Sequence, residues 1–542
     1  MKFNILILFT FLITLQGNIK AQDSGMLWSE KFEEDGHYTL LSETENGIVA
    51  LRKYRTDVPD IDRDARLELI RFDNALEISH AIEIKDLEES SYEDIGTISS
   101  PEGIAHIYYQ TTKSGSMIVS AQLFDLEDLH KTEIVDLASF KIKSKRNQNI
   151  TELNEIEVLY PMDIVLSNDK SKLVVFYNQE RVGKRKETYY QYRVIDIFNQ
   201  FRVLHEGDFY SDGRSDKYKI SDIDLSNNGE LTYLLKRYKE NVNTEFINKK
   251  PAYAYEVHHM AGDTTDYIYD IKTKGDFIDR LMVSSDNEGN IFIAGYLRKK
   301  PFGEITAAYF MGLDRLGYDI AQSKDKYRPR EIERMQGKKD TELDDDFEIV
   351  DIIASDDIVY VIKQYRRLTS TQINNGLVGR NNGFGNAGFG NNNFGNRNYD
   401  WDFEELIVEG YGKTSGEMMW SVTNPRRQDE NDRYIRSFIS GYNKLIGSDL
   451  FLFYNERPDN VERIRKKEKL KWTNMPGDTS EPMIVRINTE GEIKYRSLKG
   501  EKRYHVPNTG VLVGNQNLYM IHSKSNFDEF KVGKAAIDIL RF

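Results

Sequence analysis

One β-hairpin, residues 277–300, constrains the fold of this chain more than any other stretch. Its sequence is FIDRLMVSSDNEGNIFIAGYLRKK, and its turn at 285–290 is rich in Asp, Asn and Gly, which tolerate the positive φ of tight turns. The second arm, Ile291–Leu297, is an almost unbroken apolar run. A strand with one exposed face alternates between apolar and polar residues, so this run predicts a strand that is covered on both faces.

Similar hairpins recur along the whole chain, and most are followed by a second pair of strands. The second arms of these hairpins begin near Ile48, Ile104, Leu173, Leu231, Ile291, Ile358, Leu450 and Leu518. The outer pairs are equally visible, for example 66–72 followed by 76–84. Repetition of one supersecondary unit is typical of architectures in which each unit buries its faces against its neighbours.

Residues 286–295 have the form D-x-x-G-N-I-F-I-A-G, and in this the hairpin resembles one blade of exported repeat-type β-propeller proteins. The composition also resembles that of exported proteins of Bacteroidetes-type Gram-negative bacteria. The resemblance implies an all-β fold with a single β-propeller, for which we expect eight four-stranded blades. Seven blades are the main alternative, and a pair of β-sandwiches or an open β array is a further one.

The two ends of the chain each carry an incomplete unit. An orphan strand at 27–32 precedes the first hairpin, and only one strand, 535–542, is expected after the last hairpin. If the N-terminal strand completes the C-terminal blade, every unit has four strands and the chain ends close the ring. Helix is expected to be minor, within 330–336 and 461–472.

The N-terminus has the features of a secretory signal peptide. A charged start is followed by an apolar run at 5–15 and by Ala21, after which we expect cleavage. The expected organisation is therefore a signal peptide at 1–21 and a propeller domain at 22–542, located in the periplasm, with secretion or the cell surface as alternatives. The apolar run is too short to cross a bilayer, so no transmembrane segment is expected.

Cysteine usage and charge exclude further classes. The chain has 0 cysteines, which excludes disulfides, thiolate metal sites and a lipidated cysteine. The net charge of -14 argues against wholesale binding of nucleic acid or anionic membranes.

Loop lengths differ between the two faces of the expected disc. Turns between the first and second strands of a blade open on one face, which we call the short-turn face. Connections between the second and third strands open on the other, the long-loop face, and the long ones are 56–64, 181–187, 239–251, 298–304, 368–402, 457–482 and 526–533. Long loops on a rigid scaffold commonly carry binding function. Variation at an unconstrained rim is the alternative.

The long loops also carry most of the clustered basic residues, which would attract an acidic partner. Solvated hairpin ends are the alternative explanation. The loop at 368–402 is a low-complexity Gly/Asn/Phe-rich insertion that cannot bury enough apolar surface to fold alone, although its aromatic residues are candidates for weak contacts. The candidate partner-binding residues are Arg181, Lys184, Arg185, Lys186, Lys299, Lys300, Arg366, Arg367, Phe384, Phe389, Phe394, Arg465, Lys466, Lys467 and Trp472.

No catalytic, cofactor-binding or metal-binding residues are predicted. The chain lacks an H-E-x-x-H motif, a G-x-S-x-G motif and a P-loop. His258 and His259 are adjacent on an expected strand, so they point to opposite faces and cannot bind one ion together. The acidic run at 340–348 lacks calcium-loop spacing. The G-x-G-x-x-G match at 383–388 has no strand-to-helix unit around it.

Three functions follow as hypotheses. The first is a non-enzymatic exported β-propeller that binds a partner protein of the cell envelope through its long-loop face. The second is a carbohydrate-binding or carbohydrate-active propeller, suggested by 32 Tyr and 4 Trp that are able to stack on sugars. The third is an outer-membrane barrel, suggested by the terminal Phe542 after alternating apolar residues.

Overall fold

The computed structural model describes most of the chain between residues 26 and 542. The described residues are 26–32, 36–55, 65–84, 92–112, 116–141, 162–180, 188–209, 218–239, 244–262, 265–272, 275–301, 303–327, 332, 347–369, 400–431, 442–466, 468–475, 480–498, 504–507, 509–524 and 529–542.

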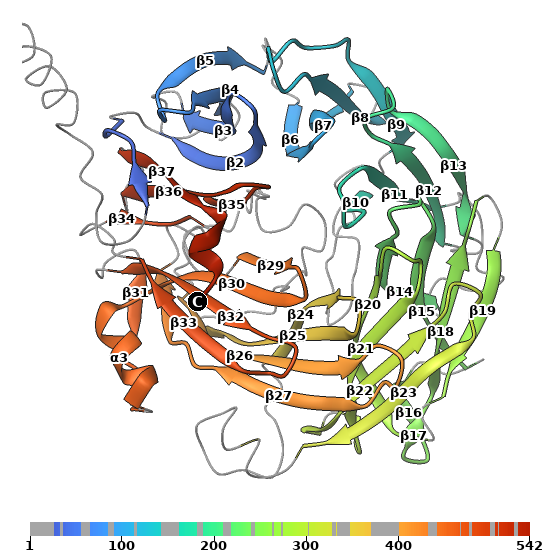
Figure 1. Ribbon diagram of the computed structural model, residues 1–542. Coiled ribbons are helices and arrows are strands. Elements are labelled where there is room, and N and C mark those ends of the chain that lie inside the picture. Colours follow the sequence, from blue (N-terminus) through green and yellow to red (C-terminus); the bar gives the residue numbers. More distant parts are fainter. Residues whose placement is uncertain are drawn as a thin grey trace, which may run out of the picture.

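The described strands form a ring of antiparallel sheets whose strands run in chain order from the axis outward (Figure 1). Blades 1 to 3 are β2 (His37–Thr44), β3 (Gly47–Arg55), β4 (Ala65–Asp73) and β5 (Ile78–Glu83); β6 (Tyr92–Ser100), β7 (Gly103–Thr111), β8 (Ser116–Phe124) and β9 (Val135–Lys141); and β10 (Met162–Leu166), β11 (Lys172–Glu180), β12 (Thr188–Asp196) and β13 (Arg202–Phe209). Blades 4 and 5 are β14 (Tyr218–Leu225), β15 (Leu231–Tyr238), β18 (Tyr253–Met260) and β19 (Thr265–Ile271); and β20 (Phe277–Ser285), β21 (Ile291–Arg298), β22 (Ile305–Leu313) and β23 (Asp319–Lys326).

The remaining blades complete the ring. Blades 6 and 7 are β24 (Phe347–Ala354), β25 (Ile358–Thr369), β26 (Asp400–Gly412) and β27 (Met418–Asn424); and β29 (Tyr442–Ile446), β30 (Asp449–Glu456), β32 (Glu481–Ile487) and β33 (Ile493–Ser497). Blade 8 is β35 (Val511–Val513), β36 (Asn517–Lys524), β37 (Phe530–Ala536) and β1 (Leu27–Trp28), with β34 (Tyr504–His505) also paired to β36. The protein is an all-β propeller of 8 blades, as the repeats predict.

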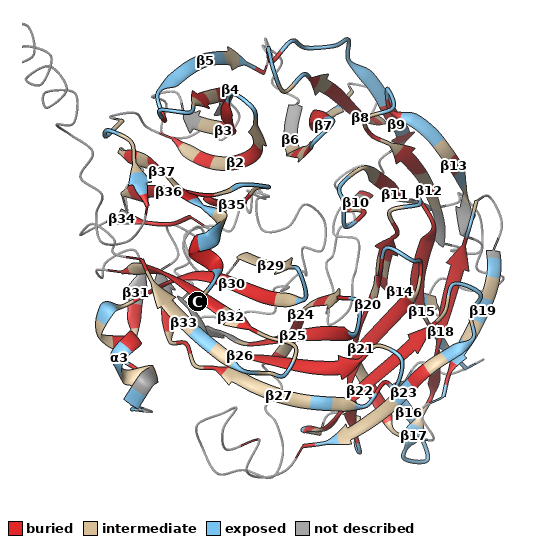
Figure 2. Cartoon of the chain, in the orientation of Figure 1, coloured by how far each residue is buried: buried red, intermediate tan, exposed pale blue. Residues whose placement is uncertain are grey.

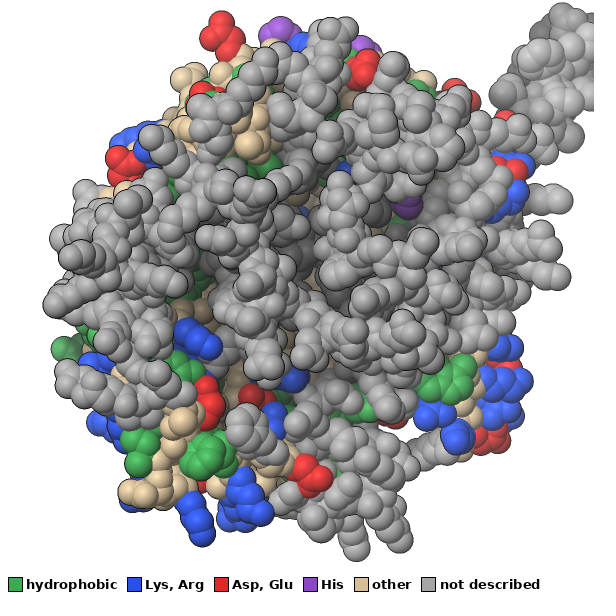
Figure 3. All heavy atoms as spheres, turned by 180° about the vertical axis from the view of Figure 1, so that it is seen from behind, with side chains coloured by type: hydrophobic (Ala, Val, Ile, Leu, Met, Phe, Trp, Pro, Cys, Tyr) green, Lys and Arg blue, Asp and Glu red, His purple; other side chains and the backbone are tan. Residues whose placement is uncertain are grey.

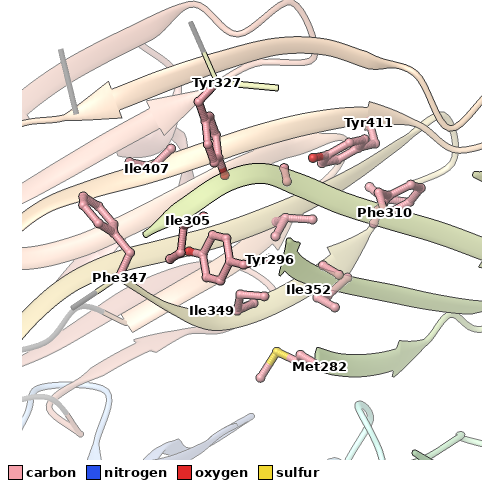
Figure 4. Close-up of a cluster of buried hydrophobic side chains, with 14 of the residues drawn as sticks. Met282, Tyr296, Ile305, Phe310, Tyr327, Phe347, Ile349, Ile352, Ile407 and Tyr411 are labelled. Atoms are coloured by element: carbon pink, nitrogen blue, oxygen red, sulfur yellow. The ribbon is translucent and has the colours of Figure 1, made fainter. Parts of the chain in front are cut away.

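The second strands explain why the repeats read as continuous apolar runs. All residues of β21 are buried, and Figure 2 shows buried residues concentrated on the inner strands while outer strands such as β5 and β19 carry exposed residues. Ile291 and Ile293 pack against blade 4, whereas Phe292 and Ala294 pack against blade 6. Figure 4 shows the cluster on the blade 6 side, which includes Tyr411. Each blade therefore buries both faces of its sheet against its neighbours.

The turn between β20 and β21 is built as its sequence suggests. Gly289 has φ +85 and its amide donates to the Asp286 carbonyl at 3.2 Å. The Asp286 carboxylate accepts the amides of Glu288 and Asn290 at 2.9 and 2.8 Å. The carboxylate and the glycine together hold the chain reversal between the two strands.

The N-terminal strand closes the ring, as predicted. β1 pairs with β37, Leu27 opposite Lys534 and Trp28 opposite Gly533. Phe32 forms a further bridge with Phe530, and the two rings stack with centroids 4.9 Å apart. The outer strand of the last blade therefore precedes the first blade in sequence.

The predicted terminal strand at 535–542 is wrong. β37 ends at Ala536, and Ile537–Leu540 form a 3-10 turn. Ile539 and Leu540 are both buried against a cluster that includes Val513 and Leu518. A strand would place consecutive side chains on opposite faces, and the turn allows both to enter one cluster.

Several elements are added to the blades on the long-loop face. Blade 4 carries a small hairpin of β16 (Phe246–Ile247) and β17 (Lys250–Pro251). β26 extends past its blade to pair with β28 (Gln428–Asn431), and β31 (Thr473–Met475) of the blade 7 insertion pairs in parallel with β28.

The same blade 7 insertion contains α3 (Pro458–Lys466), which begins and ends earlier than the predicted 461–472. Proline fits this first helical position because its missing amide has no intrahelical partner there. Of the other expected helix, 330–336, only Ile332 lies within the described residues. No helix within the described ranges is long and apolar enough to cross a bilayer.

Candidate functional site

The long-loop face offers a rigid apolar tip at the β16–β17 hairpin. Its turn residues, Asn248 and Lys249, have φ of 50 and 63, the pair of positive values found in tight two-residue hairpins. Phe246 and Ile247 are 42% and 39% exposed. Lys249 and Lys250 are also exposed, and no ion pair involving either is found among the described residues. The tip thus presents two apolar and two cationic side chains to solvent.

A buried lysine fixes this hairpin to blade 4. Glu245, at the base of β16, accepts hydrogen bonds from Lys236 Nζ at 3.0 Å and from the Tyr238 hydroxyl at 2.6 Å. The Lys236 ammonium lies 4.2 Å from the centroid of the Tyr253 ring. The backbone adds an amide donation from Ala252 to the Glu245 carbonyl at 2.9 Å. These contacts orient the tip without help from its exposed side chains.

A second structured insertion, 457–475, is fixed by a buried carboxylate. Glu456 Oε1 accepts hydrogen bonds from the Arg457 amide, from Asn460 Nδ2 and from Thr473 Oγ1 at 2.8, 2.8 and 2.9 Å. Burial raises the pKa of Glu456 above its ordinary value, while these hydrogen bonds lower it. Glu456 therefore joins β30, the start of α3 and β31.

Much of the positive charge of this insertion is neutralised within it. Lys471 Nζ lies 2.5 Å from Asp459 Oδ2, and Arg457 Nε lies 3.2 Å from Asp459 Oδ1. Arg463 lies 3.8 Å from Glu468. Figure 3, a view from behind, shows Lys and Arg side chains intermixed with Asp and Glu at the lower right, over α3. This segment is a mixed-charge surface and not a uniformly basic one.

The structure places only some of the predicted partner-binding residues. Lys299 and Lys300 are exposed in the turn after β21, and Lys466 is exposed at the end of α3. Trp472 is half-buried, with the Arg427 guanidinium 5.0 Å from its ring centroid. The two lysines after β21 belong to blade 5, whereas Lys466 and Trp472 belong to the blade 7 insertion, and no contact between the two groups is found among the described residues.

The other predicted residues cannot be placed as side chains. Arg366, Arg367 and Arg465 lie in β25 and α3, and only their backbone is described. The rest lie outside the described residues: Arg181, Lys184, Arg185, Lys186, Phe384, Phe389, Phe394 and Lys467.

The apolar tip was not predicted from the sequence. The motif Phe246-Ile247-Asn248-Lys249 contains a signal, because two apolar residues directly before a pair suited to a tight turn cannot both point inward. In the sequence this motif falls within the long loop 239–251, which stands out by its length and by the basic residues Lys249 and Lys250 and not by its apolar pair.

His258 and His259 point to opposite faces of β18, as their adjacent positions predict. His258 stacks on Tyr233 and its Nε2 lies 3.0 Å from Glu256 Oε2, whereas His259 stacks on Tyr267 and hydrogen bonds to Thr232. Burial lowers the pKa of both imidazoles. In the part of the chain that the structure describes, no group of three or more His, Cys, Asp or Glu side chains is arranged to hold a metal ion.

The carboxylates on the inner strand β14 link two blades. The Asp222 carboxylate accepts the Val283 amide of blade 5 at 2.8 Å, and the Asp224 carboxylate accepts the Ser285 hydroxyl at 2.6 Å. Both side chains are buried, and burial raises the pKa of Asp224 to about 7. Their hydrogen bonds give this pair a structural role between blades.

Comparison with known proteins supports no assignment beyond the fold. No protein-family model matches the chain, and no curated protein matches it. Similar solved structures include the β-propeller domain of the Trilobed protease from Pyrococcus furiosus, with 10% identity, coverage of 86% of this chain and 97% of that chain, and a TM-score of 0.33. Another is the WD40 domain of SCAP from fission yeast, with 8% identity, coverage of 93% and 96%, and a TM-score of 0.33. At these values the similarity carries no information on activity or partners.

Proposed function

We propose that this protein is a non-enzymatic, exported β-propeller that binds a partner protein of the cell envelope through its long-loop face. The observation that supports this most is the β16–β17 tip, where Phe246 and Ile247 are exposed on a hairpin fixed by Glu245. Exposed apolar side chains on a preorganised element bind with little loss of conformational entropy. The chemistry of the tip fits a partner with an apolar cleft bordered by carboxylates.

The contribution of this tip to the free energy of binding is expected to be large enough to measure. Complete burial of a large apolar side chain contributes roughly 1.5–3 kcal/mol. Phe246 and Ile247 are already partly covered, so about 1–2 kcal/mol each is a reasonable share. Loss of both is therefore expected to weaken binding by about 30-fold or more, since each 1.4 kcal/mol corresponds to a factor of ten.

A matched pair of variants tests this function. Phe246→Ser with Ile247→Ser removes the apolar tip, whereas Ile268→Ser changes a 58% exposed side chain on the outer strand β19 of the same blade. Partners captured from envelope extracts are identified, purified and titrated against all three proteins. The tip variant is expected to lose affinity while the Ile268→Ser protein binds as the wild type does. Equal binding by all three would contradict the proposal.

Export is tested separately. The mature protein is expected to begin at Gln22 and to be recovered from the periplasmic fraction. Cytosolic material with an intact Met1 would refute this part of the proposal and leave the binding tip to be judged by the titration.

The carbohydrate alternative would gain support from a pocket at the ring axis with two carboxylates flanked by aromatic rings. Of the inner-strand carboxylates, Asp222 and Asp224 are buried and hydrogen bonded to blade 5. No observation on the described residues therefore favours that alternative over partner binding.

A further inference from the structure

A row of polar side chains crosses blade 4 on the face that meets blade 5. Thr232 of β15 lies opposite His259 of β18, and His259 lies opposite Tyr267 of β19. The Thr232 hydroxyl is 3.0 Å from His259 Nδ1, and the rings of His259 and Tyr267 stack with centroids 4.9 Å apart. Leu234, two residues after Thr232, belongs to the same buried cluster as Val283 of blade 5. This side of β15 therefore faces blade 5.

Glu230 extends the row directly before β15. It precedes Thr232 by two residues and points to the same face. On the blade 5 side, Glu230 Oε1 accepts a hydrogen bond from Arg315 Nε at 3.0 Å. Arg315 and Gly317 belong to the same tight turn between β22 and β23. Gly317 lies against the Tyr267 ring, since a Cβ at this position would be 2.7 Å from the ring.

These contacts form a closed circuit around one place between the two blades. The circuit runs from Glu230 through the blade 5 turn to Tyr267, then through His259 to Thr232, and back along β15. Glu230 and His259 are only 5% and 2% exposed. Glu230 Oε2, His259 Nε2 and the Tyr267 hydroxyl oxygen are buried, and none of these three atoms has a hydrogen-bond partner among the described residues. Three polar atoms of adjoining side chains are therefore available to a ligand.

Two of these groups are oriented in the way that metal ligands usually are. When the proton on His259 Nδ1 is donated to Thr232 Oγ1, Nε2 presents its lone pair. The Arg315 guanidinium binds Oε1 of Glu230 and leaves Oε2 for a ligand. Such hydrogen bonds to the far side of an imidazole or a carboxylate fix the orientation of a metal ligand. Burial also lowers the pKa of His259, which keeps the imidazole neutral and able to coordinate.

We propose that Glu230, His259 and Tyr267 bind a divalent transition-metal cation of the zinc type between blades 4 and 5. Imidazole nitrogen and carboxylate oxygen are ligands that Zn²⁺ takes, the phenol oxygen supplies a third, and water completes a tetrahedral set. Arg315 is 57% exposed, so one side chain separates the Glu230 carboxylate from solvent. The site lies at the short-turn face, apart from the β16–β17 tip, and it does not rest on the proposed partner binding.

Calorimetric titration of the untagged full chain with Zn²⁺ tests the ligands. His259→Gln and Glu230→Gln are each expected to weaken binding by at least about tenfold, a loss typical even of groups that only orient a ligand. Tyr267→Phe keeps the stacked ring and is expected to cost less. His258→Gln is the matched control, because this imidazole lies on the opposite face of β18, with its Nε2 3.0 Å from Glu256 Oε2. The control is expected to bind Zn²⁺ as the wild type does.

Anomalous X-ray diffraction at the zinc edge locates the ion without any substitution. Crystals of the wild type grown with zinc chloride are expected to show a peak about 2.0–2.2 Å from His259 Nε2 and from a Glu230 oxygen. No peak, or a peak only elsewhere, would overturn the proposal. Equal affinity of the wild type, His259→Gln and Glu230→Gln proteins would also overturn it. So would a loss in His258→Gln as large as that in His259→Gln, since the effect would then be on folding and not on a ligand.

Discussion

The ion pair between Lys363 and Glu409 offers a quantitative test of how the blades are held together. It lies between blades 5 and 6, with side chains 1% and 0% exposed and Lys363 Nζ 2.5 Å from Glu409 Oε2. The hydroxyls of Tyr327 and Tyr411 donate to the same carboxylate at 3.0 and 2.8 Å. The ammonium also lies 4.8 Å from the centroid of the Tyr296 ring. Both charges of this network are therefore compensated inside the protein.

Removal of one partner leaves the other charge buried. We expect Lys363→Met and Glu409→Gln each to lower the free energy of unfolding by about 3–5 kcal/mol. The double variant removes both charges, and the amide oxygen of the introduced glutamine still accepts a hydrogen bond from the tyrosine hydroxyls. Its loss is expected to be only about 1–2 kcal/mol, so the two changes are strongly coupled.

Equilibrium urea unfolding measures all three variants. Trp420 provides a fluorescence reporter within blade 6, since its ring centroid is 5.8 Å from that of Tyr360. Asp538→Asn is the control, because Asp538 and Arg541 are 70% and 83% exposed and such pairs contribute about 0–1 kcal/mol. A double variant whose loss equals the sum of the two single losses would refute the reasoning. Single losses no larger than that of the control would also refute it.

Other contacts yield three more testable expectations. Asp224 has a pKa of about 7 when folded and 3.8 as its ordinary value, so the folded state holds an extra proton between these values and stability contributed by this group falls as pH rises through that window. Asp224→Asn keeps a polar partner for Ser285, so its free energy of unfolding in urea should equal that of the wild type near pH 4. Above pH 7 its free energy of unfolding should exceed the wild-type value by at most about 4 kcal/mol. A difference that does not change between these pH values would contradict the raised pKa. Deletion of residues 27–32 should lower the melting temperature far more than Leu27→Ala, whose side chain is 43% exposed, because it leaves the edge of β37 unpaired; equal melting temperatures would argue against closure by the N-terminal strand. Lys249→Glu with Lys250→Glu should slow association with an acidic partner and reduce its salt dependence, measured by stopped flow. Reversal of Lys494, an exposed lysine on the outer strand β33, should change neither. An unaffected rate would show that these charges do not contribute to the proposed interface.

The repeating hairpin, the ring of eight blades and its closure were predictable from the sequence. These are local and periodic properties: a doubly buried second strand needs a continuous apolar run, as in Ile291–Leu297, and a tight turn needs residues such as Gly289. The orphan strand at 27–32 was recognisable because one strand was missing from the last blade. The end of the chain was harder to predict, since a short apolar segment such as 537–540 suits a strand and a 3-10 turn alike.

Which charges are available to a ligand depends on the tertiary structure. The basic run at 463–471 is nearly continuous in sequence, but folding places Asp459 and Glu468 beside its members and leaves a mixed surface. Pairing between charges depends on distances in space, which the fold sets, and for this reason periodicity alone could not reveal this result.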